Sequence, residues 1–272
     1  MADITAPARL SPAQIESYRR DGLVIPDYRL PDAQLAKLRS ALDALLAANP
    51  HVRPEQLISA HIRRGPEKTI GHEAFLEFAH DPHILDMVEQ IAGPDLILWG
   101  CQVFCKPAGD GYEVPWHQDG RYWPIRPLAT CTVWVALDRS SPENGCMRYI
   151  PGSHARGHVY RHRNDTRPDL ALDLVLADDA VDTGAARDVV LEPGMMSLHD
   201  VYLVHGSNPN RSGKRRAGLA LRYMPASSHF DRAMFAPRTS GNGLTVDYTN
   251  RPIWLVRGVD RSAKNDFTVG KT

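Results

Sequence analysis

His117 and Asp119 lie two positions apart in the segment Trp-His-Gln-Asp. In an extended strand alternate side chains project from the same face, so this spacing predicts that His117 and Asp119 point together while Gln118 points away. One imidazole and one carboxylate can supply two adjacent ligands to a divalent metal ion. A third ligand must come from another part of the fold. His205 is the best candidate, because it follows an apolar stretch at residues 202–204 that we expect to be a strand.

Two histidines and one carboxylate form a recognisable ligand set. It is typical of the facial triad of non-haem Fe(II) oxygenases, which leaves open positions on the metal. The competing interpretation is a surface or core His–Asp pair with no metal, and the chain contains twelve histidines from which such a pair could arise by chance. The pair alone therefore does not identify a metal site.

A second candidate group lies on a strand that we expect at residues 215–223. One face of this strand would carry Arg216, Gly218, Ala220 and Arg222. The planar guanidinium of Arg216 matches a carboxylate with two parallel hydrogen bonds, and the small residues beyond it leave room for a bound molecule. The alternative is a basic surface cluster that comprises Arg211, Lys214, Arg215 and Arg216.

Other polar residues near these candidates have more ordinary interpretations. His199 and Asp200 are neighbours and would face opposite sides of a strand, so we expect them to have a structural or ligand-supporting role. His154, in the sequence Pro-Gly-Ser-His, is assigned to loop structure. Tyr122 and Arg126 follow the His–Asp pair at the expected rim of a pocket, and they are the candidate substrate contacts.

The elements that must position these residues divide the chain into a helical front and a strand-rich back. Ser11 is expected to cap a first helix, residues 31–49 repeat leucines along one helical stripe, and a third helix is expected from Asp81-Pro82 to Gly93. After residue 93 the apolar period changes to that of strands. Strands are expected at residues 96–106, 130–138, 146–150, 189–191 and 215–223.

This order of elements predicts a mainly β fold, a sandwich or barrel with a helical layer on its outside. No internal repeat or linker divides the chain, so residues 1–272 are expected to form a single domain. Within it, residues 1–94 would form the helical layer, 95–225 the barrel core and 226–272 a C-terminal extension. Residues 156–187 are polar and weakly periodic, which indicates a long insertion or lid loop.

Composition limits the class of protein. The 272 residues include 32 basic and 32 acidic side chains, and 43% are hydrophobic. This balance excludes disorder as the main state and argues against a dedicated nucleic-acid-binding protein. The N-terminus lacks a signal-peptide pattern and no apolar run is long enough to span a bilayer, so we expect a cytoplasmic protein that does not bind membranes. The four cysteines, expected to be buried and reduced, are Cys101, Cys105, Cys131 and Cys146.

Several ordered motifs resemble those of the phytanoyl-CoA dioxygenase family, and together they span about residues 96–223. The N-terminal motifs are Gln102, Lys106-Pro107, Val114-Pro115-Trp116-His117-Gln118-Asp119, Tyr122-Trp123-Pro124, Trp134-Val135-Ala136-Leu137-Asp138, Glu143-Asn144-Gly145-Cys146 and Ile150-Pro151-Gly152-Ser153-His154. The C-terminal motifs are His205-Gly206-Ser207-Asn208-Pro209-Asn210 and Arg216. Ordered motifs at these spacings are far more specific than the His–Asp pair alone.

The resemblance implies a double-stranded β-helix, a jelly-roll or cupin-like barrel, with Fe(II) as cofactor and 2-oxoglutarate and O2 as cosubstrates. It makes His117, Asp119 and His205 the iron ligands. It assigns Arg216 to the distal carboxylate of 2-oxoglutarate, with Ser207 assisting, and places Gln102 and Trp134 in the wall of the cosubstrate pocket. Because the carboxylate ligand Asp119 is retained, where related halogenases have a small residue, the resemblance implies a hydroxylase that releases succinate and CO2.

The substrate implied is a small molecule whose identity the sequence does not specify. Arg156, Arg161, Arg163 and Arg167 in the expected lid suggest an anionic substrate, although a solvated loop is the preferred explanation for them. Two alternatives to this function stay open: a zinc- or manganese-dependent barrel enzyme that does not use 2-oxoglutarate, and a non-catalytic small-molecule binding barrel.

Overall fold

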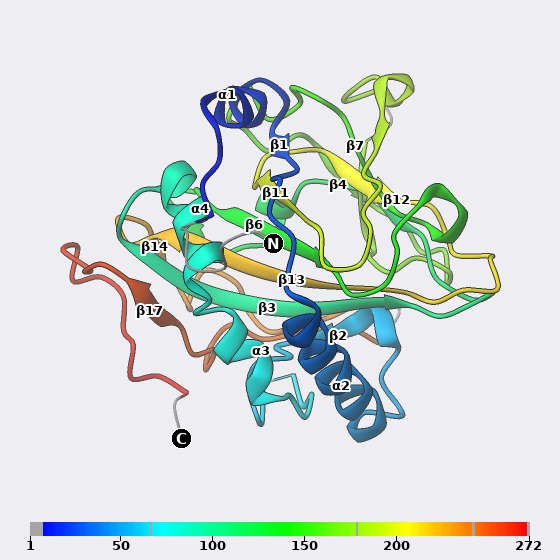
Figure 1. Cartoon of the computed structure of the whole chain (residues 1–272), viewed down its shortest axis with the longest axis horizontal. Helices are drawn as coiled ribbons and strands as arrows, with labels where there is room; N and C mark the ends of the chain where they lie inside the picture. Colours follow the sequence, from blue (N-terminus) through cyan, green and yellow to red (C-terminus); the bar gives the residue numbers. More distant parts are fainter. Residues whose placement is uncertain (1–7, 66, 178, 241–242, 271–272) are drawn as a thin grey trace.

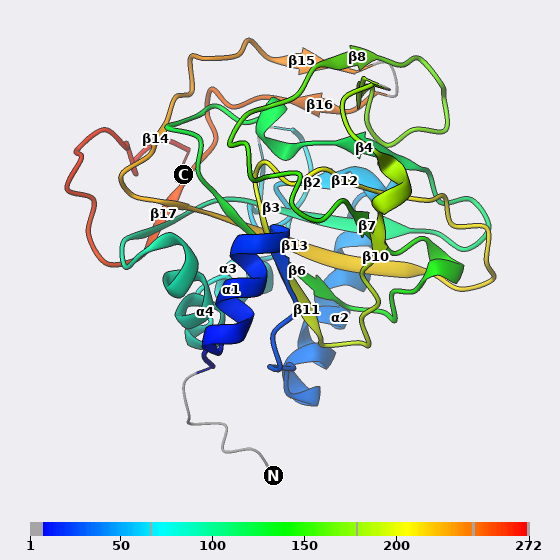
Figure 2. The same ribbon diagram turned by 90° about the horizontal axis from the view of Figure 1, so that it is seen from above.

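Two antiparallel β-sheets form the main part of the fold (Figure 1 and Figure 2). Side chains of both sheets line one cavity. The computed structural model describes residues 8–65, 67–177, 179–240 and 243–270. The larger sheet has the order β1-β11-β6-β13-β3-β17, and β2 also pairs with β3. Its strands are β1 (Leu23–Val24), β2 (Leu57–Ile58), β3 (Leu96–Lys106), β6 (Cys131–Ala136), β11 (Met196–Asp200), β13 (Arg216–Pro225) and β17 (Trp254–Arg257). The smaller sheet has the order β10-β7-β12-β4, with β4 (Val114–His117), β7 (Met147–Tyr149), β10 (Arg187–Asp188) and β12 (His205–Ser207).

The α-helices pack on the outer face of the larger sheet, on the side away from the smaller sheet (Figure 2). They are α1 (Pro12–Asp21), α2 (Asp32–Ala48), α3 (Glu73–Phe78) and α4 (Pro82–Ala92). The expected caps are present: Ser11 accepts a hydrogen bond from the Gln14 backbone, and Asp81 accepts one from the backbone of His83. The six-residue α3 was not predicted, because it is too short to establish a helical apolar period.

Apolar side chains of these helices and of the outer sheet face form one continuous core. From β13 this core receives Ala217, Leu219, Leu221 and Tyr223, which are fully buried. All four cysteines are buried and free, as predicted. The strand alternation then directs Arg216, Ala220 and Arg222 to the opposite face, where they line the cavity between the sheets. The apolar core on one face thus fixes which side chains can reach the cavity.

Two of the predicted strands are wrong. Residues 202–204 form a turn and loop between β11 and β12, and their side chains are buried or half-buried without belonging to a sheet. Instead of a strand at residues 189–191, the structure has β10 just before this stretch. Within the stretch, only Leu191 forms a β-bridge, which pairs it with Ser140. In both stretches the apolar side chains are buried by tertiary packing and not by pairing in a sheet. The sequence pattern of an apolar run is the same in the two cases.

The predicted insertion contains structure of its own. Strands β8 (His162–Asn164) and β9 (Leu174–Leu176) form a two-stranded sheet, and residues 172–174 reach the cavity. The four arginines considered as a sign of an anionic substrate do not line the cavity: Arg161 pairs with Asp179, Arg163 and Arg167 pair with Asp165, and Arg156 is exposed. These arginines therefore belong to a solvated loop and do not contact a molecule bound in the cavity.

The C-terminal extension folds back over the cavity. Strand β14 (His229–Phe230) pairs with β5 (Ile125–Arg126), β15 (Arg238–Thr239) pairs with β16 (Thr245–Val246), and β17 extends the larger sheet beyond β3. Among the residues described, no helix combines the length and apolar character needed to cross a membrane.

Candidate metal centre and cosubstrate pocket

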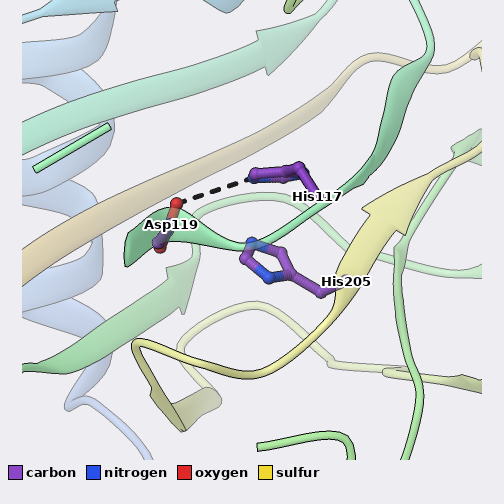
Figure 3. Close-up of side chains that lie close together, drawn as sticks. All are labelled: His117, Asp119 and His205. Carbon is purple, nitrogen blue, oxygen red and sulfur yellow. Dashed lines mark ion pairs between the residues drawn. The ribbon is translucent and has the colours of Figure 1, made fainter. Parts of the chain in front are cut away.

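His117, Asp119 and His205 meet at one point of the cavity wall (Figure 3). Each residue offers one ligand atom, and these atoms all lie within 4.8 Å of one another. The Nε2 atom of His117 is 3.6 Å from Oδ1 of Asp119, and the ring centroids of the two histidines are 4.3 Å apart. All three side chains are buried. This arrangement can hold a divalent metal ion through two imidazoles and one carboxylate.

The backbone positions the three groups. His205 on β12 is the direct partner of His117 on β4, so strand pairing brings the two imidazoles together. Asp119 begins a short 3-10 turn (Asp119–Arg121) just after β4. Gln118 is extended and points away as expected, where its amide donates to the carbonyl of Tyr202 (2.6 Å).

Hydrogen bonds select the ring nitrogen that each histidine presents. Nδ1 of His117 lies 2.8 Å from the carbonyl oxygen of Pro115, and Nδ1 of His205 lies 3.0 Å from that of Leu203. A proton on Nδ1 satisfies each carbonyl and leaves Nε2 as an unprotonated ligand atom. Both rings are therefore oriented before any metal binds.

Electrostatics keeps the ligand set in its binding form. Burial, reinforced by the nearby His117, lowers the pKa of His205 to about 3, so its imidazole is neutral at physiological pH. Burial alone would raise the pKa of Asp119, but the neighbouring His117 and His199 outweigh it and hold that pKa well below its usual range. A neutral imidazole beside an ionised carboxylate is the state that coordinates a cation.

His199 completes the surroundings of the carboxylate. Its Nε2 lies 3.8 Å from Oδ2 of Asp119, and its ring centroid is 5.0 Å from that of His205. His199 lines the cavity, whereas Asp200 on the opposite face accepts a hydrogen bond from the Tyr202 backbone. The expected opposite orientation of these neighbours is confirmed, and His199 is placed to orient Asp119.

Arg216 lies in the same cavity and not on the surface. Its side chain is buried, burial lowers its pKa to about 10, and its Nε has no hydrogen-bond partner. By contrast, Arg215 points outward and pairs with Asp138 at 2.9 Å. The interpretation of Arg216 as part of a surface cluster is thus wrong, because the alternation of β13 separates it from Arg215.

Ser207 and Trp134 lie on the walls beside Arg216. The guanidinium carbon of Arg216 is 5.4 Å from the centroid of the Trp134 ring, and Ser207 Oγ is buried without a hydrogen-bond partner. Both residues line the cavity. A buried cation and an unsatisfied hydroxyl in the wall of one cavity are suited to bind a carboxylate.

The space expected at Gly218 is already filled. A Cβ atom at this position would lie 2.0 Å from Cζ2 of Trp134, so the glycine accommodates the indole and does not leave room for a ligand. Ala220 does line the cavity, as expected.

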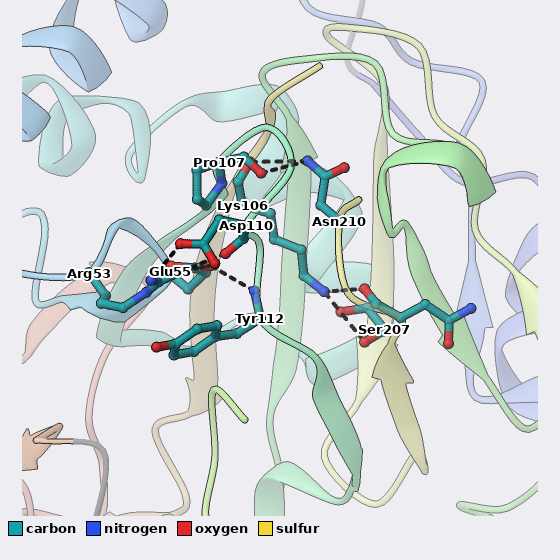
Figure 4. A network of polar contacts seen from close by, with 9 residues as sticks. Arg53, Glu55, Lys106, Pro107, Asp110, Tyr112, Ser207 and Asn210 are labelled. Carbon is teal, nitrogen blue, oxygen red and sulfur yellow. Dashed lines mark hydrogen bonds and ion pairs between the residues drawn. The ribbon is translucent and has the colours of Figure 1, made fainter. Parts of the chain in front are cut away.

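A buried lysine supports the segment that carries Ser207 (Figure 4). Nζ of Lys106 donates to the backbone carbonyls of Ser207 and Asn208. Asn210 donates to the carbonyl of Pro107 at 2.8 Å, which ties the same segment to the end of β3. This role of Lys106 was not predicted, although the residue stands in the Lys-Pro motif at residues 106–107.

The cavity has a volume of about 560 Å³, which is in the range of small-molecule sites. Tyr122 lines it and donates a hydrogen bond to the carbonyl of Leu174 in the insertion (2.6 Å). Arg126 does not line it, because its guanidinium folds back onto the carbonyl of Ile125. The structure therefore brings together all the predicted site residues except Arg126: His117, Asp119, His205, Arg216, Ser207, Gln102, Trp134 and Tyr122.

Comparison with known proteins identifies the family. The model of the phytanoyl-CoA dioxygenase (PhyH) family matches residues 18–218, which include the three candidate ligands and Arg216. The chain belongs to the phytanoyl-CoA dioxygenase family. The resemblance noted in the sequence is thereby confirmed. One curated relative of this PhyH chain is named as an alpha-ketoglutarate-dependent dioxygenase, and others are named as dioxygenases or a hydroxylase.

Two curated relatives and one solved structure illustrate the similarity. A probable alpha-ketoglutarate-dependent hypophosphite dioxygenase of Stutzerimonas stutzeri is 31% identical over 169 residues, which is 61% of this chain and 58% of that protein. The chain thus spans little more than half the length of that relative. L-proline trans-4-hydroxylase of Streptomyces griseoviridis is 25% identical over 76% of this chain and 83% of its own. The apo structure of the non-haem monooxygenase ThoJ is 28% identical, with a TM-score of 0.69 over 91% of this chain and 84% of its own.

Proposed function

We propose that this protein is an Fe(II)- and 2-oxoglutarate-dependent dioxygenase that hydroxylates a C–H bond of a small, anionic metabolite. The observation that carries the proposal is the placement, in one cavity, of a buried His–Asp–His set and of the buried Arg216, which pairs with no carboxylate among the residues that the structure describes. The first can bind Fe(II), and the second suits a cosubstrate with a free carboxylate.

The residues fit the metal. His117, Asp119 and His205 would hold Fe(II) at the wall of the cavity, where a small molecule bound in the cavity could reach it. When bound, Fe(II) and 2-oxoglutarate supply the oxidising chemistry that consumes O2, releases succinate and CO2, and hydroxylates the substrate. The chain itself orients the ligands, keeps them in the right protonation state and excludes bulk water.

The residues around Arg216 fit the cosubstrate. Arg216 would bind the distal carboxylate of 2-oxoglutarate in a bidentate manner, and the unsatisfied Ser207 hydroxyl would donate to the same group. Trp134 would form a flat wall beside it. Gln102 lies farther along β3, opposite Ala220, and would line the route from the cosubstrate to the substrate.

The proposed substrate is a small molecule. The cavity volume and the relatives named for hypophosphite and L-proline support this size class. We further infer that the two sheets form a double-stranded β-helix and that residues 1–272 are one domain. The continuous core under the helices and the pairing of β17 with β3 support this organisation.

The test is an anaerobic titration of the metal-free protein with Fe(II) and then 2-oxoglutarate. We expect one Fe(II) per chain and a weak visible charge-transfer band when 2-oxoglutarate is added. His205→Ala should abolish the band, whereas His80→Ala, at an exposed histidine outside the cavity, should retain it. Bound metal with no band would instead favour a zinc- or manganese-dependent enzyme that does not use 2-oxoglutarate. Binding of a small molecule without any metal would favour a non-catalytic barrel.

A further inference from the structure

Arg222 is a second buried arginine in the cavity, on the same strand face as Arg216. The two lie six positions apart on β13, which corresponds to roughly 20 Å along an extended strand. This separation between their backbone positions allows the two arginines to hold two different anionic groups. Arg222 lines the same cavity as Asp119, and the charge of that carboxylate acts on it, so this arginine lies within reach of the metal centre.

The surroundings of Arg222 hold its guanidinium in place. Its guanidinium carbon is 5.1 Å from the ring centroid of Trp123 and 5.6 Å from that of Trp99. Nη2 donates to Oε1 of Gln102 at 2.9 Å, whereas Nε is buried without a partner. An arginine fixed by aromatic rings and one amide is preorganised, and its remaining N–H groups are free to bind a ligand.

Apart from Arg216, the other arginines that line the cavity are either paired with a carboxylate or exposed. Arg251 forms an ion pair with Glu67, and Arg238 forms one with Asp173. Arg121 is exposed. Among the residues that the structure describes, Arg222 takes part in no ion pair, and its only side-chain hydrogen bond is the one to the neutral Gln102.

The sum of the charges in the loaded site indicates that Arg222 lacks an anionic partner. In the loaded enzyme the two positive charges of the metal and the charge of Arg216 are balanced by Asp119 and the two carboxylates of 2-oxoglutarate. Arg222 is then left as an uncompensated buried cation. Burial of an unpaired charge is unfavourable, so a ligand that brings an anion to this point gains binding free energy.

We propose that Arg222 binds an anionic oxyacid group of the substrate, a carboxylate or a phosphonate, and that Gln102 orients the guanidinium for it. This inference rests on the proposed function, because it takes Arg216 to be occupied by 2-oxoglutarate. It makes Arg222 the specificity-determining residue of the substrate side. A substrate anchored there lies between Arg222 and the metal centre.

The experiment uses the anaerobic protein loaded with Fe(II) and saturating 2-oxoglutarate. Propionate, its neutral analogue propionamide, and methylphosphonate are titrated in, and binding is measured by calorimetry while the charge-transfer band is monitored. We expect the wild-type protein to bind at least one of the two anions about tenfold or more tightly than propionamide. The stronger of the two anions then distinguishes a carboxylate substrate from a phosphonate substrate.

Three variants locate the effect. Arg222→Gln should remove the preference for the anion and leave the charge-transfer band intact, whereas Arg121→Gln, at the exposed rim, should change neither. Gln102→Glu should place a carboxylate on Arg222 and abolish anion binding while the arginine remains. If Arg222→Gln does not fold, Gln102→Glu tests the same inference, because it blocks the guanidinium while Arg222 is retained.

The outcomes that overturn the inference are distinct from those that overturn the proposed function. A charge-transfer band with equal binding of acid and amide, with no binding of either anion, or with an undiminished anion preference in both Arg222→Gln and Gln102→Glu excludes Arg222 as the anchor. Absence of the band in the wild-type protein overturns the proposed function itself. Anion binding that is lost in Arg121→Gln assigns recognition to the rim and also overturns the inference.

Discussion

The imidazoles of His117 and His205 face each other across the pairing of β4 with β12, with ring centroids 4.3 Å apart. Each ring is held by a hydrogen bond from Nδ1 to the carbonyl oxygen two residues earlier in the chain. Both histidines thus have the same local geometry. The pairing of the two strands brings their Nε2 atoms to one site, where both are available to bind a metal ion. The metal centre therefore depends on the register of two short strands.

Replacement of a proposed ligand should abolish metal binding. We expect Asp119→Ala and His205→Ala each to reduce Fe(II) below one equivalent per chain and to eliminate succinate formation, because two ligands cannot hold the ion against water. The measurement is metal content after desalting, together with succinate release. His80→Ala, whose imidazole is also held by a carbonyl but lies outside the cavity, is the matched control. Full activity in either ligand variant would exclude that residue from the site.

His199→Ala should have a milder effect than loss of a ligand. The imidazole of His199 lies beside the carboxylate of Asp119 and helps to keep it ionised and oriented. Loss of such a supporting group typically lowers metal affinity about 10- to 100-fold. Fe(II) titration should show weaker but stoichiometric binding. Complete loss of the metal would instead make His199 a ligand, and unchanged affinity would show that Asp119 needs no support from it.

Arg216→Gln should weaken 2-oxoglutarate binding. Charge-assisted hydrogen bonds contribute about 1.5–3 kcal/mol, so we expect the KM for 2-oxoglutarate to rise at least about tenfold. Fe(II) binding should be unchanged. The matched control is Arg215→Gln, which removes the adjacent arginine that pairs with Asp138 outside the cavity. Equal effects of the two substitutions would assign the change to the stability of β13 rather than to the cosubstrate.

Gly218→Ala should disturb the cosubstrate pocket through Trp134. The added methyl group would lie 2.0 Å from Cζ2 of the indole, so the ring must move. Overpacking of this kind costs about 1–3 kcal/mol of stability. We expect a lower Tm and weaker 2-oxoglutarate binding. Gly213→Ala, where an added Cβ meets no atom within 4 Å, should leave both unchanged. An unaltered Tm in Gly218→Ala would show that the tryptophan is not held tightly.

His61 should make the protein sensitive to acid. Its ring is buried without a hydrogen-bond partner, and burial, with the nearby Arg251 and Arg222, lowers its pKa to about 3. The unfolded chain has the ordinary value of about 6.5, so it binds the proton first as the pH falls. The stability contribution is complete above about pH 6.5 and is lost progressively down to about pH 3, by up to about 1.4 kcal/mol per pH unit.

The measurement for His61 is the free energy of unfolding of the metal-free protein as a function of pH. His61→Phe should show a shallower decline than the wild-type protein between these limits, whereas the exposed His51→Phe should follow the wild type. Parallel curves for the wild type and His61→Phe would show that His61 does not titrate on unfolding.

Local features of the site follow from the sequence. The pairing of His117 with Asp119, the opposite orientation of Gln118, and the separation of Arg216 from Arg215 all depend on the alternation of an extended chain. The helix caps at Ser11 and Asp81 depend on side chains within three residues of the backbone groups they satisfy. Interactions this short in range leave a direct pattern in the order of residues.

The complete site was decided by contacts between distant segments. The register that places His205 opposite His117, the filling of Gly218 by Trp134, and the return of the C-terminal extension over the cavity involve residues far apart in the chain. The same holds for the counter-charges that leave Arg216 and Arg222 unpaired while Arg251 is neutralised by Glu67. Sequence alone determined which side chains share a strand face. Only the tertiary structure decided which of the charged side chains are paired with an opposite charge. Burial and ion pairing depend on neighbours in space that the order of residues does not specify.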